Sequence, residues 1–231
     1  MGNKSSIQVE PLRKQTLSGI VAKKLEEMIL GGEILPGQRI NESHLSRRFG
    51  VSRAPVREAI RHLEKSGIVE IRVNRGTFVR TVQIREVEEL YDVRAVLDAL
   101  ACEKAAENAT RQDVARLKRI LNEMTRFVEE GKAREYFRSN LAFHETIIRC
   151  SGSHTLSALY EGIRKKAALF RRTSLSIPGR MRASVLQHSE ILAAIENRDG
   201  ERAARLAKAH TLEAKRDLLE TVALKSDPDA G

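Results

Sequence analysis

Residues Asn41–His62, NESHLSRRFGVSRAPVREAIRH, decide the fold that we expect for this chain. The stretch predicts two short helices joined by a tight turn at Gly50, because glycine readily ends a helix in a left-handed conformation. In the second helix, Arg53, Arg57 and Arg61 recur every four residues and therefore share one face.

The opposite face of the second helix is apolar and can pack into a small core; it carries Val56, Ala59, Ile60 and Leu63. A basic helix anchored in this way suits insertion into the major groove of DNA. The alternative is an ordinary surface helix whose arginines are only solvated. The sequence that follows favours DNA binding.

A period of two begins after Gly67, where Val69 and Ile71 alternate with polar residues. Asn74-Arg75-Gly76 is a turn signal, and a second short extended run follows it at 77–80. A two-stranded hairpin directly behind a helix-turn-helix is a wing. Arginines at 72, 75 and 80 suit phosphate or minor-groove contacts, and glycine lets the tip approach closely.

Composition indicates a mainly helical, basic protein. Of the 231 residues, 41% are hydrophobic and only 4% aromatic, with no Trp, which suits helical packing better than a β-sandwich. The formal net charge is +10, of which residues 1–82 carry +7 and residues 83–231 carry +3. The excess in the first third favours a DNA-binding head on a near-neutral body.

Cysteine usage and hydropathy exclude several classes of protein. Cys102 and Cys150 are the only cysteines, which is neither a disulfide framework nor a zinc finger, so we expect reduced structural thiols. There is no N-terminal apolar leader and no run of 18 apolar residues. We therefore expect a soluble, cytoplasmic protein with no membrane partner.

The chain divides into four regions: a flexible arm at 1–14, a winged helix-turn-helix domain at 15–81, a helical domain at 84–224 and a disordered tail at 225–231. The helical domain contains six amphipathic segments with short connections, which predict an antiparallel bundle. The expected helices are 84–108, 111–130, 132–151, 154–174, 179–198 and 200–224.

Contacts to DNA can be assigned from position. Arg53 and Arg57 lie where a recognition helix enters the groove and can pair with guanine edges. We expect the residues around them to hold phosphates, and the wing tip to add further contacts. The predicted DNA-binding residues are thus Ser43, Arg47, Arg48, Ser52, Arg53, Arg57, Arg75 and Gly76.

The helical domain carries a second candidate site. Asn140 and His144 are four residues apart and share a helix face, while His188 and His210 interrupt the apolar patterns of two later helices. If the three helices converge, three imidazoles and one oxygen donor could bind Zn, Ni, Mn or Fe. From spacing alone, three hydrogen-bonded core histidines are the more common outcome.

The first part of the chain resembles a known family. Residues 32–80 contain G-x-I-x-P-G, the run L-S-x-x-F-G-V-S-R-x-P-V-R-E-A-I-R-x-L and the wing R-G-T-F-V. These motifs are similar to the winged-helix domain of GntR-family bacterial transcription regulators. The resemblance implies DNA contacts from Arg47, Ser52, Arg53, Arg57 and the wing at Gly76.

Residues 86–219 resemble the all-helical FCD domain of the FadR subfamily, through L-Y-D-V-R-A-V-L-D, N-L-A-F-H, S-G-S-H, S-I-P-G-R, H-S-E-I-L-A-A-I and A-H. Many members bind a divalent metal through an Asp and three His, and the three His match His144, His188 and His210. Asn140 replaces the usual Asp, so we expect weaker or altered metal binding, and a metal-free site remains open.

The same resemblance implies that Arg94 points into the effector cavity, where a guanidinium could bind a carboxylate bidentately. The alternative is an intrahelical ion pair with Asp98, four residues further on.

Together these features predict a metabolite-responsive transcription regulator, and no enzyme. We expect a homodimeric repressor on a palindromic double-stranded operator, modulated by a small carboxylate metabolite bound near a metal. Two other functions are considered. One is a metal-dependent hydrolase with a basic accessory domain, and the other is a nonspecific architectural DNA binder.

Overall fold

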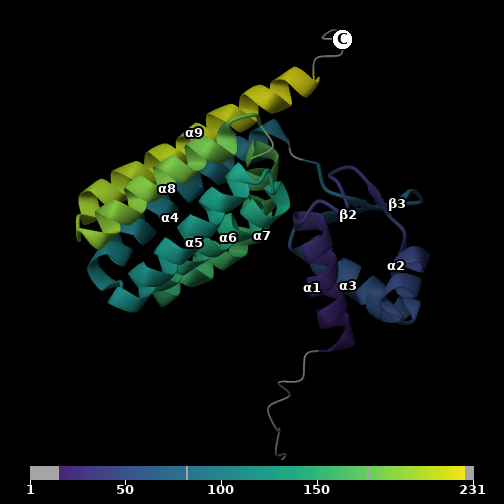
Figure 1. Ribbon diagram of the computed structural model, residues 1–231. Coiled ribbons are helices and arrows are strands. Elements are labelled where there is room, and N and C mark those ends of the chain that lie inside the picture. The colour runs from purple at the N-terminus through teal and green to yellow at the C-terminus, as the bar shows by residue number, and fades with distance from the viewer. Residues whose placement is uncertain (1–15, 82, 176, 227–231) are drawn as a thin grey trace, which may run out of the picture.

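The protein has two parts, which Figure 1 shows side by side. A computed structural model describes residues 16–81, 83–175 and 177–226. We call the elements from α1 to β3 the head and those from α4 to α9 the body. The flexible arm predicted at 1–14 lies outside the described residues, as does 227–231 of the predicted tail.

The head begins with α1 (Leu17–Leu30), which the Thr16 side chain caps by accepting from the Gly19 N–H at 3.1 Å. The next elements are β1 (Arg39–Ile40), α2 (Glu42–Phe49) and α3 (Arg53–Lys65). Their apolar faces meet in a small core that is fully closed to solvent; it includes Leu25, Ile29, Val56, Ile60 and Leu63. The predicted helix pair is therefore present.

The junction of α2 and α3 follows from three local signals. Asn41 caps α2 by accepting from the His44 N–H at 3.0 Å. Gly50 ends α2 in the left-handed conformation, with φ +65°. Ser52 occupies the N-cap position of α3 with extended backbone, a position where serine commonly caps, but its side chain makes no capping hydrogen bond.

The predicted wing is present and gains a third strand. β2 (Val69–Arg72) and β3 (Gly76–Val79) form an antiparallel hairpin in which Arg72 faces Gly76. β1 pairs with the other edge of β3, so the strand order is β1-β3-β2. Asn74 and Gly76 take positive φ values of 58° and 104° at the turn.

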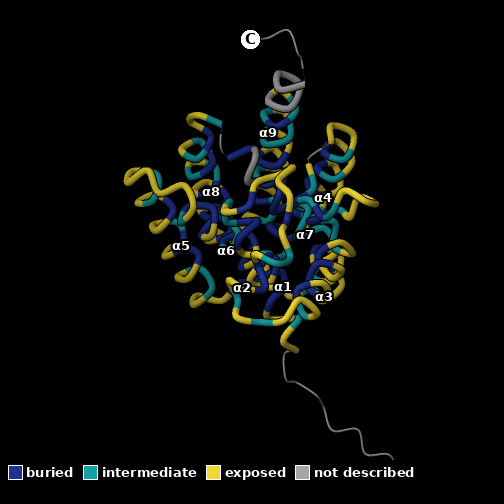
Figure 2. The backbone as a smooth tube through the Cα atoms, turned by 90° about the vertical axis from the view of Figure 1, so that its right-hand side faces the viewer, coloured by how far each residue is buried: buried dark blue, intermediate teal, exposed yellow. Residues whose placement is uncertain are grey.

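The body is an antiparallel bundle of long helices (Figure 1). Their bounds agree with the predicted segments to within two residues: α4 (Ile84–Asn108), α5 (Arg111–Glu129), α6 (Ala133–Cys150), α7 (His154–Leu175), α8 (Arg180–Glu196) and α9 (Gly200–Ser226). Figure 2 shows buried residues on the inner sides of these helices. No described helix is long and apolar enough to cross a membrane.

Helix α7 joins the body to the head. Lys165 makes a 2.7 Å ion pair with Glu26 of α1, and both side chains are largely buried. The next residue, Lys166, makes a 2.8 Å ion pair with Glu86 at the start of α4. Glu86 is also 2.9 Å from Arg80, just after the wing. Charged contacts thus connect the first helix of the head to α7, and the end of the wing to α4, whose Glu86 is shared with α7.

Gly50 provides a test of the helix-turn-helix junction. Gly50→Ala should destabilise the protein by about 1 kcal/mol, because a Cβ is disfavoured in the left-handed conformation even where space is open. Urea unfolding followed by circular dichroism measures the change. Gly162→Ala is the control: Gly162 lies in α7 facing open space, so alanine there should stabilise by about 0.5–1 kcal/mol. Equal effects at the two positions would contradict this account.

Candidate functional site

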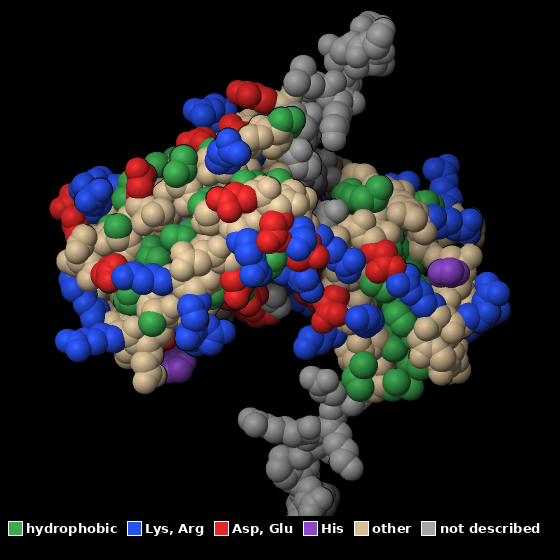
Figure 3. Space-filling model, in the orientation of Figure 1, with side chains coloured by type: hydrophobic (Ala, Val, Ile, Leu, Met, Phe, Trp, Pro, Cys, Tyr) green, Lys and Arg blue, Asp and Glu red, His purple; other side chains and the backbone are tan. Residues whose placement is uncertain are grey.

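The first candidate site is the outer surface of α3. Arg53 and Arg57 are exposed, whereas Val56 and Ala59 are buried in the head core. The helix is thus fixed from behind and presents its basic face outward. In Figure 3 the outer edge of the head, at the right, shows Lys and Arg with few acidic side chains, while both signs alternate over the body.

Three of the predicted arginines already have partners within the head. Arg57 Nε donates to Glu42 Oε2 at 2.8 Å, and Arg48 forms an ion pair with Glu33. Arg47 Nε donates to the Ser43 carbonyl at 3.3 Å. Arg53, by contrast, makes no ion pair with any described residue. A DNA phosphate or base would therefore compete with Glu42 for Arg57 but find Arg53 available.

The wing tip lies beside a residue that the sequence reading did not single out. Arg75 is exposed, and a Cβ added at Gly76 would lie 3.0 Å from Arg39 Nε. Glycine is therefore required twice at position 76, by its positive φ and by the Arg39 side chain. Arg39, in β1, adds an exposed guanidinium next to the wing.

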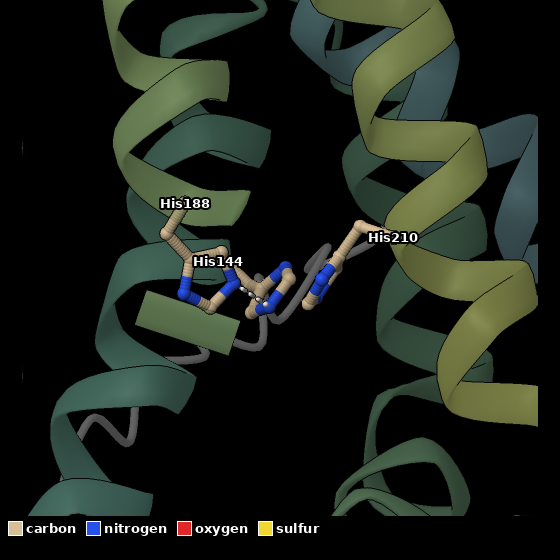
Figure 4. A group of neighbouring side chains, drawn as sticks. All are labelled: His144, His188 and His210. Carbon is tan, nitrogen blue, oxygen red and sulfur yellow. Dashed lines mark hydrogen bonds between the residues drawn. The ribbon is translucent and has the colours of Figure 1, made fainter. Parts of the chain in front are cut away.

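The second candidate site lies inside the body, where His144, His188 and His210 converge from α6, α8 and α9 (Figure 4). All three are buried, and one ring nitrogen from each lies within 4.8 Å of the others. The Nε2 atoms of His144 and His188 are 3.2 Å apart. Two nitrogen ligands on one tetrahedral zinc are separated by about 3.3 Å, given a Zn–N distance of about 2.0 Å.

The histidines are neutral, which is the form that binds metals. Burial lowers the pKa of His188 to about 3, and the charges of Arg171 and Arg180 act in the same direction. Burial likewise holds the pKa values of His144 and His210 well below their ordinary value, with Arg171 again contributing.

Gln187 orients one of the rings. His210 Nδ1 lies 2.7 Å from Gln187 Oε1, an oxygen that can only accept, so Nδ1 carries the proton and Nε2 keeps its lone pair. Gln187 is itself held by Glu213, to which it donates at 2.7 Å. Arg180 donates to the same glutamate at 2.9 Å. Our sequence reading missed Gln187, although it directly precedes His188.

The fourth predicted ligand, Asn140, lies one turn before His144 on α6 and is almost completely buried. Its Oδ1 has no hydrogen-bond partner among the described residues. It also lines a small cavity shared with His210. An unsatisfied oxygen in a cavity that one of the three imidazoles also lines fits a divalent cation, but a neutral amide holds a cation less tightly than a carboxylate does.

Two adjoining cavities of about 10 Å³ each flank the histidines. The first contains all three imidazoles and a single carboxylate, that of Asp98. The second contains Arg94, Asn140, Arg171, Ser174, Arg180 and His210. Each cavity has room for about one water molecule.

Arg94 lies in the second cavity and also makes its predicted alternative contact. Its Nη2 donates to Asp98 Oδ2 at 3.3 Å, and its guanidinium stacks on Tyr91 with the carbon 4.5 Å from the ring centroid. The Nε and Nη1 atoms have no hydrogen-bond partner among the described residues. The side chain is almost completely buried, so this is a pocket residue with donors to spare and not a surface ion pair.

A winged helix-turn-helix joined to a helical body with an internal polar cavity defines a class of protein, the ligand-responsive DNA-binding regulators. Comparison with known proteins supports this class. The family of bacterial regulatory proteins, gntR family, matches residues 17–79, and the FCD domain family matches residues 89–213.

Related proteins are also named as transcription regulators. The HTH-type transcriptional regulator YdhC of Bacillus subtilis is 30% identical over 81% of this chain and 84% of its own length. The HTH-type transcriptional repressor RspR of Escherichia coli is 26% identical over 78% of this chain and 79% of its own. The chain belongs to the GntR family of bacterial transcription regulators and carries an FCD domain, which confirms the family predicted from its motifs.

Solved structures show the same fold. E. coli McbR/YncC superposes with a TM-score of 0.79, covering 90% of this chain and 99% of that one at 23% identity. A GntR transcriptional regulator from Rhodococcus sp. RHA1 gives 0.75, covering 88% and 97% at 24% identity. The predicted mainly helical fold, a winged head on a helical bundle, is thereby confirmed.

The donor set predicts how metal content responds to substitution. Asn140→Asp should raise zinc affinity more than about tenfold, because it adds a negative charge to a neutral set of ligands. His188→Ala should abolish zinc binding, since it removes a nitrogen at the centre of the triad. Isothermal titration with Zn²⁺ measures both. His154→Ala, at an exposed position, is the control. Equal affinities for all four proteins would exclude this metal site.

Proposed function

We propose that this regulator is a metabolite-responsive repressor whose operator binding changes when a small organic acid enters the body. One observation carries the proposal: the body buries three imidazoles and the Arg94 guanidinium around cavities that no described side chain fills. Relatives with repressor in their names, such as RspR and the gluconate operon repressor of Bacillus subtilis, support the sign of regulation.

The head supplies operator recognition, for which we retain domain limits of 15–81 and 84–224. Helix α3 would enter the major groove with Arg53 and Arg57 toward base edges. The residues flanking the turn, Ser43, Arg47, Arg48 and Ser52, would then face phosphates, and Arg75 would extend the contact through the wing. Such a DNA partner implies a cytoplasmic location.

A palindromic operator requires two heads, and therefore a homodimer. Helix α4 offers an apolar face that supports one. Val93, Val96 and Leu100 recur at helical spacing and are at least 40% exposed. A second copy of the chain would cover this face and pair the heads.

A divalent metal would be held by His144, His188, His210 and Asn140, with Zn, Ni, Mn or Fe all compatible with the donors. When bound, the metal would supply a positive charge and an open coordination position for an acid group. Arg94 would bind the same acid through its free Nε and Nη1 donors.

Helix α7 is the route by which the acid would affect the head. Arg171 and Ser174 of α7 line the second cavity, while Lys165 contacts α1. Six residues of helix separate Lys165 from Arg171, about 9 Å. A ligand that shifts α7 would therefore alter the ion pairs that hold the head, which is allostery if the two head positions bind DNA differently.

The hydrolase alternative is not favoured. Membership of the GntR family indicates a transcription regulator and not an enzyme. Asp98, the carboxylate in the cavity of the triad, is occupied by Arg94 and by the Thr211 hydroxyl, which donates at 2.9 Å. Glu145 is exposed and lines a different surface hollow. No cavity-lining carboxylate is therefore placed to activate a water.

The second alternative, a nonspecific architectural DNA binder, would leave the body without a function. A nonspecific DNA binder needs basic surface but no buried imidazoles or guanidinium groups, which are unfavourable in a protein core. The cavity-lining cluster His144, His188, His210 and Arg94 thus favours a regulated protein.

Arg57→Ala tests the role of α3 as the recognition helix. On a site selected by the protein from random DNA, affinity should fall about 10- to 100-fold with loss of sequence preference, while binding to unrelated DNA remains. Glu42→Ala removes the partner of Arg57 and should preserve the preference. Arg205→Ala, on the exposed surface of α9, is the control for a lost positive charge. Fluorescence anisotropy measures all four, and an unchanged preference in Arg57→Ala would contradict the role.

A charge exchange tests the contact between head and body. Zinc bound by the histidine triad should itself change operator affinity, since it brings positive charge beside α7. Glu26→Lys and Lys165→Glu should each abolish that change, and the double variant should restore it. Because the pair is largely buried, its coupling energy should be about 1.5–3 kcal/mol in a double-mutant cycle. If both single variants respond to zinc like the parent protein, α7 does not carry the signal through this pair.

A further inference from the structure

Among the described residues of the body, three guanidinium groups are buried, and two of them have carboxylate partners. Arg94 is 3.3 Å from Asp98. Arg180 is 2.9 Å from Glu213 and 3.1 Å from Asp217. Arg171 is 7% exposed, yet among the described residues no carboxylate lies within ion-pair distance of it. Its one described hydrogen bond goes to the Tyr160 hydroxyl at 3.5 Å, the outer limit for such a contact.

An uncompensated buried charge is strongly unfavourable, so proteins pair buried charges or place them at binding sites. Arg171 lines the same cavity as Arg94 and Asn140, and the histidines beside it are neutral. At position 140 a carboxylate would have supplied the missing negative charge, but the amide does not. The cavity is therefore left with an excess positive charge that only a ligand can balance.

Other polar atoms around the cavity also lack a hydrogen-bond partner among the described residues. The hydroxyls of Tyr91, Ser174 and Ser184 are buried without a hydrogen-bond partner among the described residues, as are Nε and Nη1 of Arg94. All of these atoms can donate, and Tyr91, Ser174 and Ser184 line the cavity with Arg171. Apart from Asn140 Oδ1, the unpartnered atoms that line this cavity are therefore donors, which fits a ligand that is rich in acceptor oxygens.

We propose that Arg171 binds an acidic group of the effector, and that the effector carries at least two negative charges, as a dicarboxylate or a phosphorylated acid does. Arg94 on α4 and Arg171 on α7 would each take one oxyanion group, so the ligand bridges two helices. The cavity as it stands holds about one water molecule, so α4 and α7 would have to move apart to admit the ligand. This inference rests on the proposed function, in which the body binds an organic acid.

The bridging arrangement also explains why the ligand would matter to the head. A monoacid held by Arg94 alone would contact α4, which is already linked to α9 because the Thr211 hydroxyl donates to Asp98. A diacid would in addition neutralise Arg171 and draw on α7, the helix whose Lys165 contacts α1. The second acidic group would thus be the part of the ligand that acts on α7 and, through it, on the head; a ligand without this group would bind but leave α7 unchanged.

Matched acids test the proposal on the purified full-length protein. Thermal unfolding is followed with propanoate and malonate, butanoate and succinate, pentanoate and glutarate, and inorganic phosphate, at constant ionic strength. At least one dianion should raise the unfolding temperature more than its monoacid partner does. Arg171→Met should lower the affinity for that dianion at least tenfold while leaving the affinity for the monoacid unchanged. If no dianion exceeds its partner, the proposal is overturned.

A measurement without ligand guards against a purely structural role for Arg171. Arg171→Met should leave the unfolding temperature of the ligand-free protein unchanged or raise it, because a charge without a partner is removed. Arg180→Met, which breaks two ion pairs, should lower it. An equal decrease in both variants would make Arg171 structural and refute the proposal.

Operator affinity in the absence of acids separates this inference from the proposed function. If Arg171→Met binds operator DNA like the parent protein and no acid distinguishes the two, the diacid proposal fails while DNA recognition stands. If the parent protein itself shows no preference among DNA sequences, the proposed function fails whichever acid binds.

Discussion

The burial of cationic and polar side chains at the centre of a helical bundle is the constraint on which the rest of the body depends. His144, His188 and His210 occupy positions where such a bundle normally packs aliphatic residues. Each buried polar atom needs a partner, and Gln187 provides one for His210. Apart from the Tyr136 hydroxyl, the buried side-chain atoms with no hydrogen-bond partner among the described residues belong to residues that line the two cavities. The interior of the body is therefore organised for a ligand, at some cost to its own stability.

Asn140 determines the charge of this interior. With an acidic residue there, a divalent metal would be partly neutralised by its own ligands, and the arginines nearby would see a smaller net charge. With the amide, the metal site and the guanidinium groups add their positive charges in one small, poorly hydrated space, where charge interactions are strong. The weak metal binding and the preference for multiply charged acids that we propose would thus have the same physical origin, a single missing carboxylate.

The sequence predicted what local patterns determine. Helix and strand positions followed from apolar periodicity and from signals such as Asn41 and Gly50, and the structure bears them out. Convergence of the three histidines was a tertiary event, for which resemblance to a family was more informative than spacing. Gln187 and Arg171 escaped notice because glutamine and arginine are common on helices. Only the packing of α7, α8 and α9 shows that these side chains point inward. The missing capping bond of Ser52 likewise depends on a rotamer that no sequence pattern specifies.

Helix α7 contacts both halves of the protein, the head and the cavity inside the body. Its middle contacts α1 through Lys165 and α4 through Lys166, and its last part carries Arg171 to the cavity. A helix is stiff along its axis, so a displacement at one end moves the other by a similar amount. Arg171 is buried and, among the described residues, has no carboxylate partner, so this part of α7 lacks the kind of ion pair that Lys165 and Lys166 make earlier in the helix. An acid bound by Arg171 would supply such a partner, and any resulting shift of α7 would act on the ion pairs that hold the head. In this proposal Arg171 is both the binding group and the reason that α7 can respond.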